Sequence, residues 1–197
     1  MYFPRSSGIL LHPSSFPSRF GIGDLGSSAY EFVDFLSESK QQFWQILPLS
    51  PTEYSPYVSF GAMAGNPMLI SPEKLREDGL LSDGDLANLP AFPIDTLDFA
   101  RVKATKLPLL EKACEHFKVH ATSEQQREFL DFCYRKAYWL DDYALFMAFK
   151  DTFGGAWYDW KPEIAKREPQ AIDEWQRRLA AEIFLHKYLQ FEFFRQW

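Results

Sequence analysis

Cysteine is scarce in this chain, which holds only Cys114 and Cys133 among 197 residues. Both lie in segments with helical periodicity, a setting that favours packed, reduced thiols over a disulfide framework or a metal site. His116 and His120 are one helical turn apart, but the glutamate of a zinc-protease motif is missing between them. We therefore expect no metal site and a reducing, cytoplasmic compartment.

Long apolar runs and an excess of positive charge are also missing. No uncharged stretch is long enough to span a bilayer, and the first five residues contain no apolar signal core. The 21 basic and 27 acidic residues leave a formal charge of -6, which argues against the basic surface that nucleic acid requires. No serine follows the G-x-S-x-G pattern, so covalent acyl chemistry is disfavoured. We expect neither a membrane nor a nucleic-acid partner.

What the chain has in quantity is aromatic side chains, with 19 Phe, 9 Tyr and 6 Trp. Hydrophobic residues make up 46% and charged residues 24% of the chain, which is typical of a folded globular protein and not of a disordered one. A chain of this length buries roughly 70% of its unfolded surface, so it can build a core.

The first 50 residues predict a βαβ unit. Residues 8–12 and 43–48 have the pattern of short buried strands, and the second ends at a proline. Ser28 and Glu31 form a capping-box pattern at the start of a helix between them. The apolar stripe of that helix consists of residues at helical spacing: Ala29, Phe32, Val33 and Leu36.

A right-handed crossover makes these two strands parallel, so segments 13–27 and 49–67 leave the sheet at the same carboxyl edge, where ligands bind. The second segment carries tyrosines, serines and small residues from Tyr54 to Pro67. Aromatic faces together with hydroxyls and free backbone amides are the elements of a sugar-binding loop. The alternative is a surface loop with one packed tyrosine.

The remainder of the chain is predominantly helical. Residues 71–122 contain short polar and proline-containing pieces and a predicted helix at 99–117. Periodicity returns after Ser123, where one face is expected to carry Leu130, Cys133, Tyr134 and Ala137, and again over 142–153. We divide the chain into a βαβ unit with its substrate loop (1–70) and a mainly helical part (71–197).

The last predicted helix, from about residue 170, becomes apolar on every side over 188–197 and must be buried. Neither a cap nor a polar tail follows it, so we expect that the sequence is cut off before a third strand.

Several patterns have a competing structural interpretation. The glycines of 21–26 match G-x-G-x-x-G, but they do not follow the strand directly, because the nine residues from His12 to Phe20 precede them; we expect a glycine-bent loop and not a dinucleotide site. His12 could bond a sugar hydroxyl or hold its loop, and Asp24 could contact a ligand or bond loop amides. Asp141 and Asp142 are expected to cap a helix starting at Tyr143.

Taken together, these segments resemble the amylomaltases, the bacterial 4-alpha-glucanotransferases. The motifs that carry the resemblance are SGILLHPSSFP (7–17), GIGDLG (21–26), WQILPLSPT (44–52), SPY (55–57) and AGNP (64–67), followed by YWLDDYALFMAFK (138–150), FGGA (153–156) and LQFEFFRQW (189–197). They occur in order and cover almost the whole chain.

The resemblance implies an α/β fold, here part of a (β/α)8 barrel that contains the first two strands and a helical insertion. It implies transfer of α-1,4-glucan segments between maltooligosaccharides or starch-like glucans by a retaining double displacement, without a metal or organic cofactor. In this family the catalytic Asp and Glu residues belong to later strands, so we expect this chain alone to be inactive. A non-catalytic glucan-binding module or a non-functional fragment is the alternative.

The resemblance also assigns substrate-binding residues. Tyr57 resembles the family's glucan-stacking tyrosine, Ser55 its hydroxyl neighbour, and Tyr54 the aromatic residue of a secondary glucan site. The chain departs from the usual pattern, because two residues are missing after Tyr54 and Val58 stands where glutamine is common. The deletion shortens the link between Tyr54 and the SPY motif, which affects the role assigned to Tyr54. Val58 lacks the side-chain amide with which a glutamine could contact sugar hydroxyls.

Overall fold

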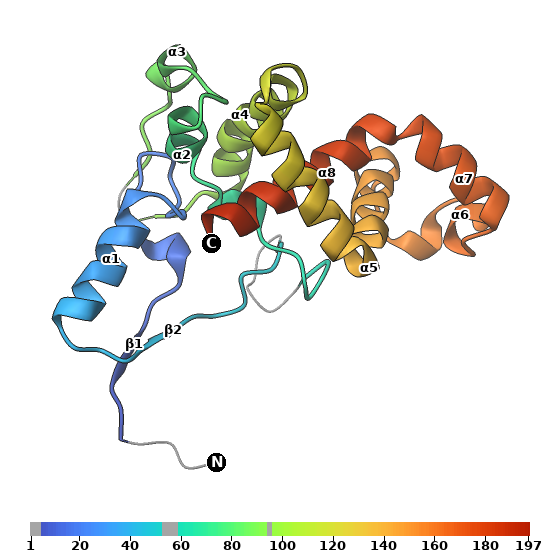
Figure 1. The fold of residues 1–197 in the computed structure, drawn as a ribbon. Coiled ribbons are helices and arrows are strands. Elements are labelled where there is room, and N and C mark those ends of the chain that lie inside the picture. Colours follow the sequence, from blue (N-terminus) through green and yellow to red (C-terminus); the bar gives the residue numbers. More distant parts are fainter. Residues whose placement is uncertain (1–4, 53–58, 94–95) are drawn as a thin grey trace. The chain divides into compact units, whose positions relative to one another are not determined.

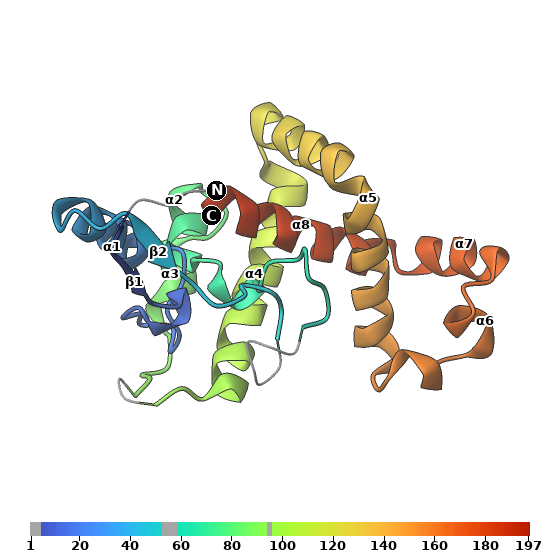
Figure 2. The same ribbon diagram turned by 90° about the horizontal axis from the view of Figure 1, so that it is seen from below.

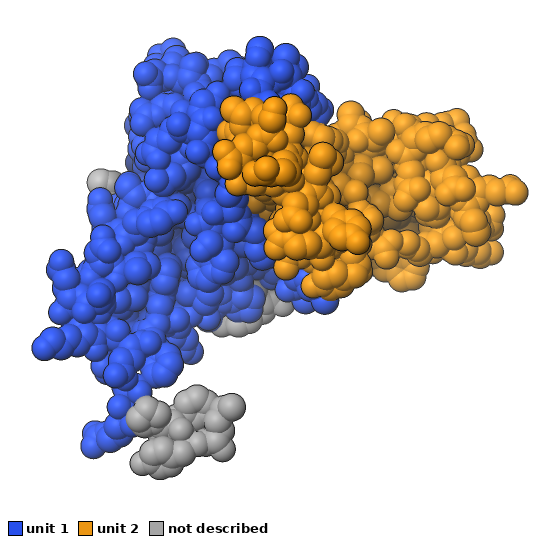
Figure 3. Space-filling model, viewed as in Figure 1, with its two compact units in different colours: residues 1–121, 192–197 blue, residues 122–191 orange. Residues whose placement is uncertain are grey.

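The computed structural model describes residues 5–52, 59–93 and 96–197. Two compact units are distinguished in Figure 3: unit 1 contains Met1–Ala121 and Glu192–Trp197, and unit 2 contains Thr122–Phe191. Each is described separately below. The boundary predicted at residue 70 separates the expected barrel strands from the helical insertion. It is a different division from these two units, and it stays a prediction.

Unit 1 begins with the predicted βαβ unit, whose element order is confirmed (Figure 1). The strands are shorter than predicted, and the prediction that they are buried is wrong, since Leu10 and Phe43 are more than half exposed. Strands β1 (Gly8–Leu10) and β2 (Phe43–Gln45) pair in parallel, with Ile9 opposite Trp44, and α1 (Ser27–Glu38) connects them. Figures 1 and 2 show α1 beside the two strands. The contact is aromatic, because the Phe32 ring of α1 lies 5.3 Å from the Trp44 ring and 5.3 Å from that of Phe16.

The predicted capping box of α1 is wrong. Gly26 is the N-cap residue and makes no side-chain cap, and the Ser28 hydroxyl instead donates to the Pro17 carbonyl at 3.1 Å. Ser28 is thus already the second helical residue. On the predicted apolar stripe Ala29 and Leu36 are buried, but Val33 is exposed.

The rest of unit 1 is helical. It contains the 3-10 turns η1 (Pro13–Ser15) and η2 (Pro67–Leu69) and the helices α2 (Pro72–Glu77), α3 (Asp83–Ala87) and α4 (Phe99–His120). The helix predicted at 99–117 is therefore confirmed as α4. The core beneath these elements includes the fully buried side chains Leu69, Ile70, Leu75, Val102 and Leu110.

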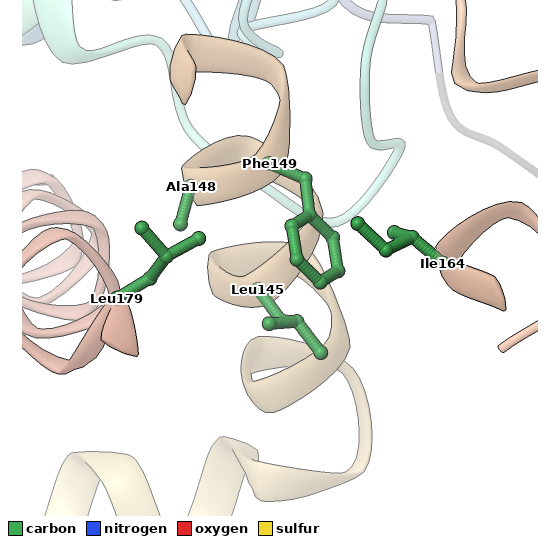
Figure 4. Close-up of a cluster of buried hydrophobic side chains, with 5 residues drawn as sticks. All are labelled: Leu145, Ala148, Phe149, Ile164 and Leu179. Atoms are coloured by element: carbon green, nitrogen blue, oxygen red, sulfur yellow. The ribbon is translucent and has the colours of Figure 1, made fainter. Parts of the chain in front are cut away.

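Unit 2 is formed by α5 (Ser123–Phe153), the turn η3 (Trp157–Asp159), α6 (Pro162–Ala165), α7 (Pro169–Arg178) and most of α8 (Ala180–Gln196). Thr122 and Gln125 form the capping box that starts α5. Figure 4 shows the buried cluster of this unit: Leu145, Ala148 and Phe149 of α5, Ile164 of α6 and Leu179 after α7.

Two expectations for α5 are wrong. The helix runs without interruption from Ser123 to Phe153, so Asp141 and Asp142 do not cap a second helix but lie inside this one. There they form ion pairs with Lys187 and Arg167, respectively. The predicted apolar face is also misplaced, since Leu130 and Tyr134 are exposed while Phe129, Phe132 and Leu140 are buried.

The end of α8 is buried, as its apolar sequence predicts. Tyr188, Leu189, Phe191 and Phe193 are all buried, and the residues from Glu192 onward belong to unit 1. There Gln196 accepts a hydrogen bond from the Ser71 amide at 2.7 Å, and Arg195 forms an ion pair with Asp78. Among the described residues, no helix combines the length and the apolar character needed to cross a bilayer.

Candidate functional site

The carboxyl edge of the β1–β2 pair is the candidate site. Tyr54, Ser55 and Tyr57, the residues predicted to bind substrate, lie outside the described residues. On either side of that segment, the Phe60 amide donates to the Pro51 carbonyl at 3.3 Å, and Ser50 and Pro51 are buried. This hydrogen bond joins the described residues on the two sides of 53–58.

The segments that follow the two strands are joined by backbone hydrogen bonds. The Leu25 amide, in the segment after β1, donates to the Leu69 carbonyl in η2 at 2.8 Å. The Asn66 amide donates to the Leu49 carbonyl at 2.7 Å, and its side chain accepts from the Met68 amide at 3.0 Å. The loop after β1 is thus joined to η2, which closely follows the segment after β2.

His12, at the end of β1, holds its own loop. Its Nδ1 accepts a hydrogen bond from the Ser14 amide at 3.2 Å and lies 2.7 Å from the Ser14 hydroxyl. Burial lowers the pKa of His12, and an interaction with the Pro48 backbone partly offsets that effect. The predicted loop-holding role is confirmed. Its buried Nε2 has no partner within hydrogen-bond geometry in the described part of the chain.

Asp24 also bonds a loop amide, as the structural interpretation of this residue predicts. Its Oδ1 accepts from the Gly26 amide at 3.0 Å, and its Oδ2 lies 3.3 Å from the Lys106 ammonium. The same ammonium donates to the Met68 carbonyl at 2.7 Å. Lys106 therefore connects the loop after β1 to the segment after β2.

Sequence reasoning missed Lys106, although a signal was present. The residue lies four positions after Val102 and four before Leu110, on the buried face of α4. A lysine in that register must either reach solvent or find buried partners. It is completely buried, and burial lowers its pKa while the Asp24 carboxylate partly offsets the effect.

The glycines of 21–26 are explained by the loop itself, which confirms the interpretation as a bent loop. Gly21 has a φ of +76°, which L side chains rarely adopt, and a Cβ at Gly23 would lie 2.2 Å from the Pro13 carbonyl oxygen. A cavity of about 780 Å³ opens beside this loop, with walls that include Ser14, Arg19 and Phe92. It offers hydroxyls, backbone and an aromatic face to a ligand.

Metal chemistry finds no support in the residues described. Within 5–52, 59–93 and 96–197, no group of three His, Cys, Asp or Glu side chains could hold an ion. Cys114 and Cys133 are both free thiols, which confirms that they are not a disulfide. Burial raises the pKa of Cys114 to about 12, so it is a poor nucleophile at neutral pH.

Comparison with known proteins identifies the family. The family model for 4-alpha-glucanotransferase matches residues 11–197. The 4-alpha-glucanotransferase of Synechocystis sp. is 47% identical over 196 residues, which are 98% of this chain and 39% of that protein. The enzyme of the same name from Thermus thermophilus is 44% identical over 200 residues, covering 100% of this chain and 39% of the relative.

A solved structure agrees with these sequence matches. The amylomaltase from Streptococcus agalactiae in complex with acarbose superimposes with a TM-score of 0.92 at 38% identity, over 98% of this chain and 40% of that chain. The present chain thus spans about 39% of the length of the curated relatives that it matches first. Since the family match covers nearly every residue, the chain belongs to the 4-alpha-glucanotransferase family.

Proposed function

We propose that this chain is the N-terminal part of an enzyme that transfers α-1,4-glucan segments between maltooligosaccharides or starch-like glucans. The observation that carries the proposal is the family match over residues 11–197. The acarbose in the structure of the Streptococcus agalactiae relative supports the substrate class, because acarbose resembles a maltooligosaccharide. In this proposal β1 and β2 are the first two strands of a (β/α)8 barrel, and the helical elements after residue 70 are its insertion.

The reaction proposed is a retaining double displacement. A carboxylate attacks the anomeric carbon and the glycosidic bond breaks, while a carboxylic acid protonates the leaving oxygen. The acceptor hydroxyl then gives its proton to the second carboxyl group and its oxygen displaces the nucleophilic carboxylate, so the configuration is retained. Two carboxyl groups about 5 Å apart are needed. We assign both to the part of the relatives that this chain does not span, so the chain alone is expected to bind glucan without turning it over.

The substrate contacts proposed for this chain are Tyr57, Ser55 and Tyr54. Tyr57 would stack on a glucosyl ring, Ser55 would bond a hydroxyl, and Tyr54 would contact a more distant part of the glucan. Their support is the family match, which includes this segment. His12 and Lys106 hold described residues of the loop after β1, and Lys106 also contacts the Met68 carbonyl.

Binding of acarbose to the purified chain tests the site. Titration calorimetry is expected to detect binding, and Tyr57→Ala is expected to weaken it about tenfold because the stacking face is lost. Tyr57→Phe is the matched control, since it keeps the ring and removes only the hydroxyl. Equal affinity of the parent chain and Tyr57→Ala would remove Tyr57 from the site.

Incubation with maltotriose tests the assignment of the catalytic groups. The chain is expected to release no glucose and to form no longer maltodextrin over hours, as followed by chromatography. Turnover that survives repeated purification would place the reacting carboxyl groups within these residues.

We also propose that the protein works in the cytoplasm. The free thiols of Cys114 and Cys133 support a reducing environment. Fractionation of the source cells, with detection of the protein by antibody, would test the location.

A further inference from the structure

Unit 2 contains a cavity of about 430 Å³ that the proposed reaction does not use. Its walls come from α5, η3, α6 and the residues that follow. The wall residues that matter here are Phe146, Phe149, Trp157, Trp160, Ile164 and Arg167. Three residues of the buried cluster in Figure 4, namely Leu145, Phe149 and Ile164, also line this cavity.

The aromatic wall formed by Trp160 is held rigidly. The Trp160 ring lies 5.5 Å from the Phe146 ring and 5.7 Å from the Phe149 ring. Its indole N–H donates to the Gly154 carbonyl at 2.7 Å, so its hydrogen bond is already satisfied within the loop. A wall of this kind can receive a ligand without first being ordered, which reduces the entropy cost of binding.

Two adjacent aromatic rings of η3 are exposed to solvent, and one of them, that of Trp157, lines the cavity. Trp157 is 55% exposed and Tyr158 is 69% exposed. Their rings are 5.8 Å apart at an interplanar angle of 75°, so they present two flat faces that are not coplanar. Folding gains little from exposed rings, and adjacent exposed aromatics indicate a binding surface.

The cavity also has a polar rim. Arg167 lines it and forms an ion pair with the Asp142 carboxylate of α5. Arg167 has a φ of +55°, a conformation that costs energy for a residue other than glycine and is maintained by its surroundings. Both side chains remain more than half exposed, so N–H donors and carboxylate oxygen stay accessible to a ligand.

We propose that Trp157, Tyr158 and the Arg167–Asp142 pair form a second contact site for α-1,4-glucan chains, located in unit 2. An α-1,4-glucan chain is curved, so the apolar faces of successive glucosyl units point in different directions. Two aromatic rings at a large interplanar angle can therefore each stack on one glucosyl unit. The arginine and aspartate supply the donors and acceptors that sugar hydroxyls require. This inference depends on the proposed function for its ligand class, and it adds a site that holds long chains.

The test uses maltoheptaose and the indole N–H signals of the six tryptophans in a proton–nitrogen NMR spectrum. The Trp157 signal is identified as the one that disappears in Trp157→Phe. Maltoheptaose is expected to shift this signal. Trp157→Ala is expected to weaken binding to unit 2 about three- to tenfold, the size of one lost aromatic contact. Tyr138→Ala is the matched control, because Tyr138 is 73% exposed on α5 and does not line the cavity.

Tyr57→Ala separates this inference from the proposed function. If the Trp157 signal still shifts in Tyr57→Ala, the second site stands whatever the fate of the first. If acarbose binds through Tyr57 while maltoheptaose leaves the Trp157 signal unmoved, the proposed function stands and the second site is refuted.

Discussion

The buried ammonium group of Lys106 connects residues of two loops. It is completely buried, yet it lies 3.3 Å from the Asp24 carboxylate and donates to the Met68 carbonyl. Its position 5.6 Å from the centre of the Phe20 ring adds a cation–π contact. Such a pair contributes little net stability compared with apolar residues, but removing one partner leaves the other charged and desolvated.

Lys106→Met is therefore expected to destabilise unit 1 by about 3 kcal/mol, because the Asp24 carboxylate loses its cation. Adding Asp24→Asn is expected to recover at least half of that loss, since the asparagine oxygen can still accept from the Gly26 amide. Urea unfolding followed by circular dichroism measures both values. Failure of the second change to rescue the first would show that the charge pair is not the cause.

Asp85 gives a pH-dependent prediction. Hydrogen bonds from Lys112 and from Ser82 lower the pKa of Asp85 from 3.8 to about 2. A carboxyl group whose pKa is lower in the folded state adds stability above pH 3.8, and this stability is lost as the pH falls through about 2. Asp85→Asn is expected to cost about 0.5–1 kcal/mol at pH 7, allowing for solvent around Lys112.

The cost of Asp85→Asn should shrink as the pH falls towards 2, where about half of the Asp85 carboxyl groups in the folded protein are protonated. Thermal unfolding at pH 7, 4 and 2 gives the comparison, with Asp83→Asn as the control because Asp83 is far more exposed. A cost that stays constant over this range would mean that the charge of Asp85 plays no part.

At the scale of elements, the loop between β1 and α1 is defined by close backbone contacts. The Gly23 amide donates to the Ser14 carbonyl at 2.9 Å, and no space remains for a side chain beside the Pro13 carbonyl. A dinucleotide site would use its glycines to approach a phosphate, whereas here they allow the loop to fold against itself.

Gly23→Ala is expected to displace this loop and to destabilise unit 1 by about 1–3 kcal/mol through overpacking. Gly84→Ala is a suitable control, because a Cβ at Gly84 would meet only the Ser82 hydroxyl at 3.6 Å. The measurement is urea unfolding together with acarbose affinity. Unchanged values for Gly23→Ala would show that the loop adapts easily.

The sequence predicts the types of elements better than their contacts. The βαβ unit, α4 and the burial of α8 follow from periodicity and are confirmed. The prediction of the α1 cap was wrong because the helix starts after Gly26 and the Ser28 hydroxyl donates to the Pro17 carbonyl in the preceding loop. The α5 face failed because aromatic residues fill both sides of the helix, so the pattern does not single out Phe129 and Phe132 as buried.

At the scale of the molecule, the cores of the two units consist of different residues. Unit 2 depends on the cluster around Phe149 and Leu145, and unit 1 on the residues around Lys106, Leu69 and Ile70. Changes in separate cores that share no partners are expected to act additively and locally.

Phe149→Ala is expected to cost about 3–5 kcal/mol and to act mainly on unit 2. Hydrogen exchange read by mass spectrometry should show lost protection in residues 122–191, with protection retained around 69–75. Lys106→Met should give the reverse pattern. If either variant lowers protection equally everywhere, the two units unfold as one.

For the whole molecule, the sequence predicted the family, because the motifs that carry the resemblance are ordered along the chain. The individual contacts were less predictable. Lys106 and Trp157 lie outside any motif that sequence reasoning assigned to a site, and their roles depend on distances to residues far along the chain, such as Asp24, or on exposure after folding.

The reactivity of the Cys114 thiol reports on local unfolding around α4. The thiol is buried in α4, and burial raises its pKa to about 12. An alkylating reagent can therefore react only after the thiol becomes accessible and loses its proton. The rate at which iodoacetamide labels this position, compared with labelling of the unfolded chain, therefore counts how often the helix is released from its neighbours.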